Sequence, residues 1–351
     1  MRLALVGAGN IAARYAAAIT ATDGLELAGV TDALQGRAEE LATAHGGVAY
    51  ASLDALLADD AVDTVVNLTV PQAHVEVTAA ALDAGKHVHS EKPLALRHAD
   101  AQGLLELAAA RGVRLSSAPA TLLGEAQQTF WKLVREGAIG RVRAAYAEAN
   151  WDRVEHWHPD PRSLYDVGPV VDVGIYPLAI LTAMFGPVRR AHAYATTLEP
   201  ERVLLDGTPF TPGASDFVVA VLEHAQGVVT RLTASFYVGP CRQRGLELHG
   251  DTGSLYLPTW AEADSRLFLQ QRGGEYEQQS LLREPFSGID WARALVDLAD
   301  AIATGRPHRA SGEHAAHLVE VLAAVEASAA AAAPVEVSSD FAAPEPLEWA
   351  R

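Results

Sequence analysis

Short apolar runs alternate with helix-length, alanine-rich stretches through the first 120 residues of the chain. The apolar runs have the length of buried strands, and they cover residues 3–6, 25–30, 62–68, 87–89 and 113–115. The helical stretches between them include residues 14–19, 35–44, 73–84 and 99–110. Strands that alternate with helices form βαβ units, in which helices cover both faces of a parallel sheet. The alternation therefore predicts an α/β fold with a parallel N-terminal sheet.

The pattern changes after about residue 120. A helix is expected over residues 124–136, and long strands over residues 141–151, 188–197, 216–222, 227–236, 245–249 and 253–257. Short glycine-containing connections at residues 224–227 and 250–253 predict antiparallel hairpins. Helices at residues 291–303 and 313–332 close the chain. We expect two domains, residues 1–120 and an α+β domain of residues 121–351 with an open, mostly antiparallel sheet.

Composition narrows the classes of partner. Of the 351 residues, 49% are hydrophobic and 20% are charged, which is enough apolar material for a sizeable core. The 27 Lys and Arg against 44 Asp and Glu give a net charge of −17, which disfavours a nucleic-acid partner. Cys241 is the single cysteine and can form no internal disulfide. The N-terminal apolar run is short for a secretory segment, and no apolar run approaches the roughly 18 residues of a membrane span. We therefore expect a cytoplasmic protein with no nucleic-acid or membrane partner.

A glycine motif lies between the first strand and the first helix. The motif is Gly7-Ala8-Gly9-Asn10-Ile11-Ala12, with the spacing G-x-G-x-x-A. Gly7 suits a tight turn, Gly9 lets the backbone approach a pyrophosphate, and Ala12 allows close packing of the helix on the strand. The N-terminus of the helix offers unpaired N–H groups to phosphates. The sequence therefore predicts a dinucleotide site that includes Gly7, Gly9, Asn10, Ile11 and Ala12.

Asp32 indicates which dinucleotide is preferred. It ends the second expected strand about 20 residues after the motif, where a carboxylate accepts hydrogen bonds from the ribose hydroxyls of NAD. The same carboxylate would repel the additional phosphate of NADP. No arginine follows immediately, and Arg37 is the nearest. We expect NAD as cofactor, with NADP less favoured.

Three further segments, together with the glycine motif, carry a resemblance. They are NLTVPQAH at residues 67–74, at the end of the expected strand over residues 62–68, EKP at residues 91–93, after the strand over residues 87–89, and DVGIYP at residues 172–177. Their order and separations along nearly the whole chain resemble the glucose–fructose oxidoreductase/inositol dehydrogenase (Gfo/Idh/MocA) family.

The resemblance implies a Rossmann domain and an α/β domain whose open sheet often forms subunit interfaces. It also implies NAD(P)-dependent oxidation or reduction of one carbon of a sugar, an inositol or a related cyclic polyol. By the same resemblance, Thr69 and His74 line the cofactor cleft, and Glu91 and Lys92 reach the nicotinamide ribose and the substrate. Asp172 and Tyr176 complete the site; many members have a histidine at the position of Tyr176.

Chemistry supports the same candidates independently. Lys92 follows a parallel strand at its carboxyl end, the edge where ligands bind in such sheets. Removing hydride from an alcohol carbon also requires removal of the hydroxyl proton, so a cation and a titratable group must lie beside that oxygen. Asp172 and Tyr176 at positions i and i+4 share one face of a helix. The ordinary pKa of a tyrosine hydroxyl is near 10, so Tyr176 needs a neighbouring cation to release its proton readily. Lys92 can supply that cation.

Each candidate also has a plainer interpretation. Lys92 fits a solvated loop lysine, Asp172 an N-cap, Tyr176 a core aromatic, and His74 a residue packed on the sheet edge. Members of the family often have three glycines before the aspartate, whereas this chain keeps only Gly168 in that loop. The substrate pocket is therefore expected to differ from that of other members.

Weaker signals lie elsewhere in the chain. Trp151, His156 and Trp157 belong to an aromatic, polar stretch that suits a sugar-binding wall, or else ordinary packing or an interface. The His87/His89 and His156/His158 pairs lack the Cys or carboxylate neighbours of a metal site, so we expect no metal.

Two other functions compete with a dehydrogenase. One is a glycosidase of the same fold that retains NAD through an oxidation–elimination cycle. The other is a non-catalytic sensor of a sugar or NAD, which would not need Lys92, Asp172 and Tyr176. The apolar strands at residues 216–222 and 227–236 would be an aggregation risk if left bare, so we expect a homodimer or homotetramer.

Overall fold

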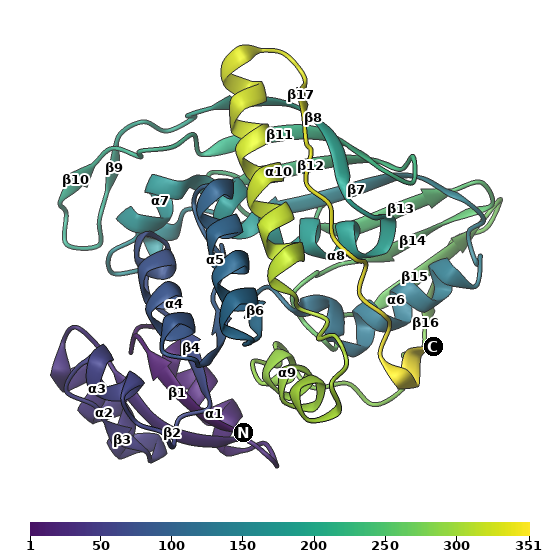
Figure 1. Ribbon diagram of the computed structural model, residues 1–351. Helices are drawn as coiled ribbons and strands as arrows, with labels where there is room; N and C mark the ends of the chain where they lie inside the picture. The colour runs from purple at the N-terminus through teal and green to yellow at the C-terminus, as the bar shows by residue number, and fades with distance from the viewer. The chain divides into compact units, whose positions relative to one another are not determined.

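The structure is a computed structural model that describes residues 1–351. The chain forms two compact units (Figure 1). The first comprises Met1–Ala120 and Asp290–Val319, and the second comprises Thr121–Ile289 and Glu320–Arg351. Each unit has its own sheet.

The first unit is built on a six-stranded parallel sheet, which confirms the predicted α/β fold. The strands are β1 (Arg2–Val6), β2 (Glu26–Thr31), β3 (Val48–Ala49), β4 (Thr64–Asn67), β5 (His87–Ser90) and β6 (Leu115–Ser117). Their order is β3-β2-β1-β4-β5-β6, so the direction of winding reverses between β1 and β4. Ligands of doubly wound sheets bind at the carboxyl ends of the strands at such a reversal.

Helices cover both faces of this sheet. They are α1 (Ala12–Thr20), α2 (Gln35–His45), α3 (Leu53–Leu57), α4 (His74–Asp83), α5 (His98–Arg111) and the short η1 (Pro71–Ala73). Successive residues of β1 serve the two faces, because side chains alternate along a strand. Leu3 and Leu5 pack in the core that contains α1, whereas Ala4 and Val6 pack in the core that contains α4 and α5.

Residues 290–319 return to the first unit after the chain has formed most of the second. Helix α9 (Arg293–Thr304) places Leu295 in the core beside α1, and Trp291 lies 5.3 Å from Tyr15, ring centre to ring centre. Helix α10 (Gly312–Ala331) begins in the first unit and ends in the second. The predicted second domain, residues 121–351, includes this segment, because amphipathicity shows that a helix packs on a sheet but not on which one.

The second unit is built on a nine-stranded, mostly antiparallel sheet. The strands are β7 (Val142–Asn150), β8 (Val188–Thr196), β11 (Phe217–His224), β12 (Val229–Ser235), β13 (Gly245–Gly250), β14 (Gly253–Leu257), β15 (Leu267–Gln271), β16 (Tyr276–Gln279) and β17 (Val335–Glu336). Their order is β16-β15-β14-β13-β7-β12-β11-β8-β17, and only the β12–β7 pair is parallel. The predicted hairpins β11–β12 and β13–β14 are confirmed.

Several short elements were not predicted from the sequence. They are β15, β16, β17, the small hairpin of β9 (Arg202–Val203) and β10 (Pro209–Phe210), and the short helices η2 (Thr121–Leu123), η3 (Val154–His156) and η5 (Glu348–Ala350). Helix α6 (Glu125–Arg135) lies within the predicted range. These missed elements are too short to show a clear hydrophobic period.

A helical segment of 24 residues, kinked at Gly168, runs through the second unit from Arg162 to Phe185. It consists of α7 (Arg162–Pro169), the π-helical turn η4 (Val170–Gly174) and α8 (Ile175–Phe185). Length and composition alone would allow this segment to cross a membrane, contrary to the sequence expectation that no run was long enough. Because 89% of its most apolar 18-residue stretch is buried inside the structure, the segment is a core helix of this unit.

Candidate functional site

The glycine turn packs tightly against the end of β4. Gly7 has a φ of +101°, and a Cβ there would lie 2.8 Å from the carbonyl oxygen of Leu68. Its N–H donates to the carbonyl oxygen of Thr31 at 2.9 Å. Only glycine accepts both this backbone conformation and this approach without strain. The turn therefore holds the start of α1 beside the carboxyl ends of β2 and β4.

The N-terminus of α1 is open to an anion. A Cβ added to Gly9 would meet no atom within 4 Å, so space is open beside the backbone there. Ile11 is the N-cap residue and makes no side-chain capping bond, and the first turn of α1 contains no acidic side chain. Helix N-termini of this kind bind phosphate groups through their N–H groups. These residues fit the pyrophosphate of a dinucleotide.

Asp32 is tied directly to the glycine turn. One carboxylate oxygen accepts the N–H of Ala8 at 2.7 Å and the other accepts the N–H of Leu34 at 2.8 Å. The side chain is half-buried, whereas Leu34 is 57% exposed. Each carboxylate oxygen can accept more than one hydrogen bond, so Asp32 retains acceptor capacity for ribose hydroxyls. Its position agrees with the acidic residue of a dinucleotide site.

Asn67 organises the loop that follows β4. Its side-chain oxygen accepts from the Thr69 hydroxyl at 2.7 Å and from the Thr69 N–H at 3.2 Å. Its side-chain nitrogen donates to the His74 carbonyl at 3.1 Å and to the Thr78 hydroxyl at 3.0 Å. Asn67 is fully buried, so each of these bonds satisfies a group that water cannot reach. Thr69 is thereby fixed at the carboxyl edge of the sheet.

His74 joins two loops at this edge. Its Nδ1 lies 2.6 Å from the Pro93 carbonyl oxygen and its Nε2 lies 3.0 Å from the Thr69 carbonyl oxygen. Burial lowers the pKa of His74 below its ordinary value, and the two carbonyls oppose that shift. Both ring nitrogens face protein carbonyls, so His74 fixes the loop after β4 against the loop after β5.

Glu91 and Lys92 follow β5 directly. The Glu91 N–H donates to the Asn67 carbonyl at 2.8 Å, which continues the pairing of β5 with β4. One Glu91 carboxylate oxygen accepts the Tyr15 hydroxyl at 2.8 Å, and the other accepts the Lys92 N–H at 3.1 Å. Glu91 is 6% exposed and Tyr15 is 3% exposed. The structure thus brings the glycine turn, Asp32, Thr69, His74, Glu91 and Lys92 to one edge of the first sheet.

Asp172 and Tyr176 belong to the second unit. Asp172 lies in the π-helical turn η4, and Tyr176 follows in the first turn of α8. The expected helical face of Asp172 and Tyr176 requires a regular α-helix, whereas the turn at Asp172 is π-helical. Such turns are often found at functional sites. Gly168, the one glycine kept before this turn, has a φ of +77° and forms the kink at which α7 ends.

Tyr176 forms part of an aromatic cluster with two tryptophans. Its ring stacks on Trp260 at 5.0 Å and 26°, and Trp260 lies 6.0 Å from Trp151. The Trp260 indole N–H donates to the Glu148 carbonyl at 3.1 Å, which fixes the orientation of the central ring. Trp151 is 44% exposed, so the cluster extends from a half-buried tyrosine to an accessible indole face.

His156 and Trp157 are both exposed, and the Trp157 ring contacts that of His158 at 5.6 Å between ring centres. Trp151, the third substrate-wall candidate from the sequence, is joined to Tyr176 through Trp260. Trp260 was not predicted, because nothing in its local sequence links it to the segment around residue 151.

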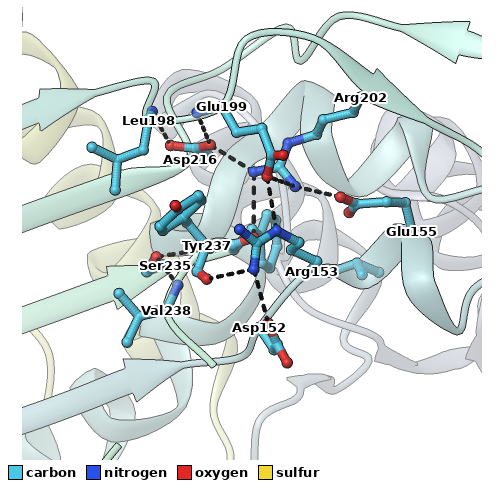
Figure 2. A network of polar contacts seen from close by, with 12 residues as sticks. Asp152, Arg153, Glu155, Leu198, Glu199, Arg202, Asp216, Ser235, Tyr237 and Val238 are labelled. Carbon is cyan, nitrogen blue, oxygen red and sulfur yellow. Dashed lines mark hydrogen bonds and ion pairs between the residues drawn. The ribbon is translucent and has the colours of Figure 1, made fainter. Parts of the chain in front are cut away.

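A buried ionic network anchors the segment between Trp151 and the start of α7 (Figure 2). Arg202, whose side chain is fully buried, donates to Glu155 at 2.6 Å and to Asp216 at 2.6 Å. The Tyr165 hydroxyl also bonds both Glu155 and Arg202. Figure 2 shows Arg153 beside this group, paired with Glu199 at 2.8 Å.

Neighbouring groups lock the network in place. The Asp216 carboxylate additionally accepts the N–H groups of Leu198 and Glu199. Burial and the Glu155 hydrogen bond raise the pKa of the Tyr165 hydroxyl far above its ordinary value, so that it remains a donor. The network holds the short helix η3 against the β9–β10 hairpin. No group of three or more His, Cys, Asp and Glu side chains in the structure is arranged as a metal site.

Family models match both units. A model described as an oxidoreductase family with an NAD-binding Rossmann fold matches residues 1–118. A model described as the GFO/IDH/MocA C-terminal domain matches residues 128–256. The dTDP-3,4-didehydro-2,6-dideoxy-alpha-D-glucose 3-reductase of Streptomyces violaceoruber is 33% identical over 251 residues, which are 67% of this chain and 70% of that protein. The match spans 61% of the corresponding reductase of Streptomyces antibioticus and 57% of the trans-1,2-dihydrobenzene-1,2-diol dehydrogenase of Oryctolagus cuniculus, at 32% and 30% identity.

Solved structures share the fold over almost the whole chain. A levoglucosan dehydrogenase in complex with NADH and L-sorbose superposes with a TM-score of 0.82 at 21% identity, covering 97% of this chain and 99% of that one. A 3-ketoreductase from Actinomadura kijaniata, in complex with TDP-benzene and NADP, superposes with a TM-score of 0.75 at 23% identity, covering 93% and 97%. These likenesses confirm the predicted fold. The two family models and the relative from Streptomyces violaceoruber establish that the chain belongs to the Gfo/Idh/MocA family of oxidoreductases.

Proposed function

We propose that this oxidoreductase transfers hydride between nicotinamide and one carbon of a sugar or cyclic polyol, with NAD as its preferred cofactor. The observation that carries the proposal is the anchored Glu91–Lys92 segment at the carboxyl edge of the first sheet, the same edge as the glycine turn and Asp32. A cation next to a dinucleotide site is what alcohol oxidation requires.

The chemistry divides between the cofactor and the side chains. When bound, a nicotinamide dinucleotide accepts hydride from an alcohol carbon or returns it to a carbonyl carbon. We assign to Lys92 the hydrogen bond to the reacting oxygen, where its charge favours the alkoxide-like transition state. We assign to Tyr176 the relay of the hydroxyl proton: its oxygen accepts the proton of the substrate hydroxyl as its own proton passes to solvent, with Asp172 on the same helical segment orienting the tyrosine.

The preference for NAD rests on Asp32. Its carboxylate is held by the N–H groups of Ala8 and Leu34, so it cannot swing away from an incoming phosphate without losing both bonds. A fixed negative charge disfavours the 2′-phosphate of NADP and favours the two ribose hydroxyls of NAD. Related structures contain NADH in one case and NADP in the other, so the residue present in this chain is the relevant observation.

The aromatic cluster supports a ring-shaped substrate. Sugars and inositols present apolar C–H faces that stack on indole rings, and Trp151 offers such a face beside Trp260 and Tyr176. A nucleotide-linked sugar, the class of substrate named for the relative from Streptomyces violaceoruber, belongs in the same test.

A turnover screen tests the proposal. NAD or NADP is mixed with free sugars, inositols and nucleotide-linked sugars, and reduced cofactor is followed at its absorbance. We expect steady formation of NADH with at least one ring polyol. A glycosidase that retains NAD would cleave a glycoside without steady NADH formation, and a sensor would bind ligands without turnover; either result would contradict the proposal.

We also propose that the protein is a homodimer or homotetramer formed through the second sheet. On its outer surface, Arg231 of β12 lies between its directly paired neighbours, Tyr146 of β7 and Val221 of β11. Tyr146 and Val221 are 38% and 43% exposed, and Tyr194 on β8 is 63% exposed. A wide sheet surface with exposed aromatic and branched side chains is typical of an interface between subunits.

A further inference from the structure

Tyr15 lies on the helix of the glycine motif, yet its hydroxyl reaches the end of a different strand. It points from α1 to the Glu91 carboxylate after β5, at 2.8 Å. The ring is packed among aromatic side chains, with the Trp291 ring centre at 5.3 Å and the His89 ring centre at 6.2 Å. Both ends of the bond are buried, so solvent competes little with it. A single tyrosine hydroxyl therefore joins the phosphate-binding helix to the segment that carries Lys92.

The Glu91 carboxylate passes this constraint to Lys92. Its second oxygen accepts the Lys92 N–H at 3.1 Å, and the Glu91 N–H is fixed by the Asn67 carbonyl. Removing the tyrosine hydroxyl would leave one oxygen of a buried carboxylate without this donor, and an unsatisfied buried acceptor is costly. The carboxylate would then rotate to find another donor, and the Lys92 N–H would lose its fixed partner.

We propose that Tyr15 is a positioning residue that couples the cofactor-binding helix to the Glu91–Lys92 segment. The proposal rests on the proposed function, because it assigns Tyr15 a role in binding NADH and in placing Lys92. A merely structural tyrosine would contribute to folding stability and leave cofactor affinity unchanged.

Tyr50 provides a matched control in the same unit. Its hydroxyl donates to Asp59 at 2.6 Å, so Tyr50→Phe also removes one tyrosine–carboxylate hydrogen bond. Tyr50 follows β3 and is 9% exposed, and its hydroxyl bonds a residue outside the candidate site. Tyr15→Phe keeps the aromatic ring and its packing, so both variants are expected to fold.

The test measures two quantities in the wild type and both variants. The first is NADH affinity, from the fluorescence of bound NADH. The second is hydrogen–deuterium exchange of the peptide that spans residues 88–96. We expect Tyr15→Phe to weaken NADH binding roughly three- to tenfold, which is less than the full loss of one charged hydrogen bond. Exchange of that peptide should accelerate, while Tyr50→Phe changes neither quantity more than twofold.

A double-mutant cycle identifies the route of the effect. In a Glu91→Gln background, Tyr15→Phe should change NADH affinity much less than in the wild type, because the carboxylate that transmits the effect is gone. The inference about Tyr15 would be wrong if Tyr15→Phe had equal effects on NADH affinity in both backgrounds, or if it changed neither NADH affinity nor exchange. Neither result would affect the proposed function, provided that the wild type binds NADH. Failure of the wild type to bind NADH or NADPH would instead refute the proposed function and this inference with it.

Discussion

The N–H of Ala8 donates a hydrogen bond of 2.7 Å to the Asp32 carboxylate, which ties the turn that follows β1 to the residue that follows β2. Asp32, the expected partner of the ribose hydroxyls, and the glycine turn, the expected partner of the pyrophosphate, are therefore joined by a direct hydrogen bond. A change at Asp32 is expected to alter both the selectivity of the site and the geometry of the turn.

Asp32→Asn separates these two effects. The amide oxygen still accepts the Ala8 N–H, but the negative charge is gone. We expect NADH affinity to fall about tenfold from the weaker acceptor, and NADPH affinity to fall less or to rise. Titrations of both cofactors measure the ratio. A wild-type protein that prefers NADPH tenfold or more would contradict the role given to Asp32.

The proton-transfer assignment predicts coupled losses. Lys92→Met and Tyr176→Phe should each lower turnover by roughly 10²- to 10⁴-fold, because each removes a group needed chiefly in the transition state. The double variant should lose less than the product of the two, since both groups act on one proton. NADH affinity of Tyr176→Phe should be unchanged. Nearly full activity in Tyr176→Phe would make Tyr176 a packing residue and leave Lys92 as the sole acid–base group.

Buried histidine makes stability depend on pH. Burial lowers the pKa of His224 to about 4, and its ring nitrogens contact the Gly186 carbonyl and the Thr230 hydroxyl. The unfolded chain takes up the proton near pH 6.5, whereas the folded protein does so only near the lowered pKa. Stability from this group is therefore present above pH 6.5 and is lost as the pH falls from 6.5 towards 4.

Unfolding in urea at pH 7 and pH 5 measures this effect. His224→Gln should reduce the difference in unfolding free energy between the two pH values by about 2 kcal/mol. The buried His89, whose pKa is also lowered to about 4, remains in both proteins and serves as an internal reference. An unchanged difference would show that His224 does not contribute in this way.

Arg202 is expected to be a major determinant of stability in the second unit. Arg202→Met leaves Glu155 and Asp216 buried without their cation, and breaking a buried ion pair in this way costs about 3–5 kcal/mol. Arg143→Met, which breaks an exposed pair with Asp251, should cost much less. Chemical denaturation of the two variants compares them. Equal losses would mean that the buried network contributes no more than a surface pair.

Assembly through the outer surface of the second sheet predicts the mass in solution. Sedimentation should give a multiple of the 37.2 kDa chain at micromolar concentration. Tyr194→Glu, which places a charge on the exposed surface of β8, should shift the protein towards the monomer. A wild-type monomer would refute the proposed assembly, and an unaffected oligomer in Tyr194→Glu would locate the interface elsewhere.

The sequence by itself determined the elements whose signal is local. Strong alternation of apolar runs and helices predicted the parallel sheet, and the glycine connections at residues 224–227 and 250–253 predicted two hairpins. The glycine motif also predicted the turn after β1, because the positive φ at Gly7 and the open space beside Gly9 both follow from the absence of a side chain. In each case the physical cause acts over a few neighbouring residues, so one sequence suffices to read it.

Only the tertiary structure decided which distant residues meet. Tyr15 and Glu91, Tyr176 and Trp260, and Arg202 and Glu155 are paired by packing of elements that the chain separates widely. The π-helical turn at Asp172 and the return of α9 to the first sheet likewise have no local signature. Hydrogen bonds and ring contacts between remote segments depend on how whole elements pack to bury their apolar surfaces. Local hydrophobic periodicity shows that an element has an apolar face, but not which other element covers it.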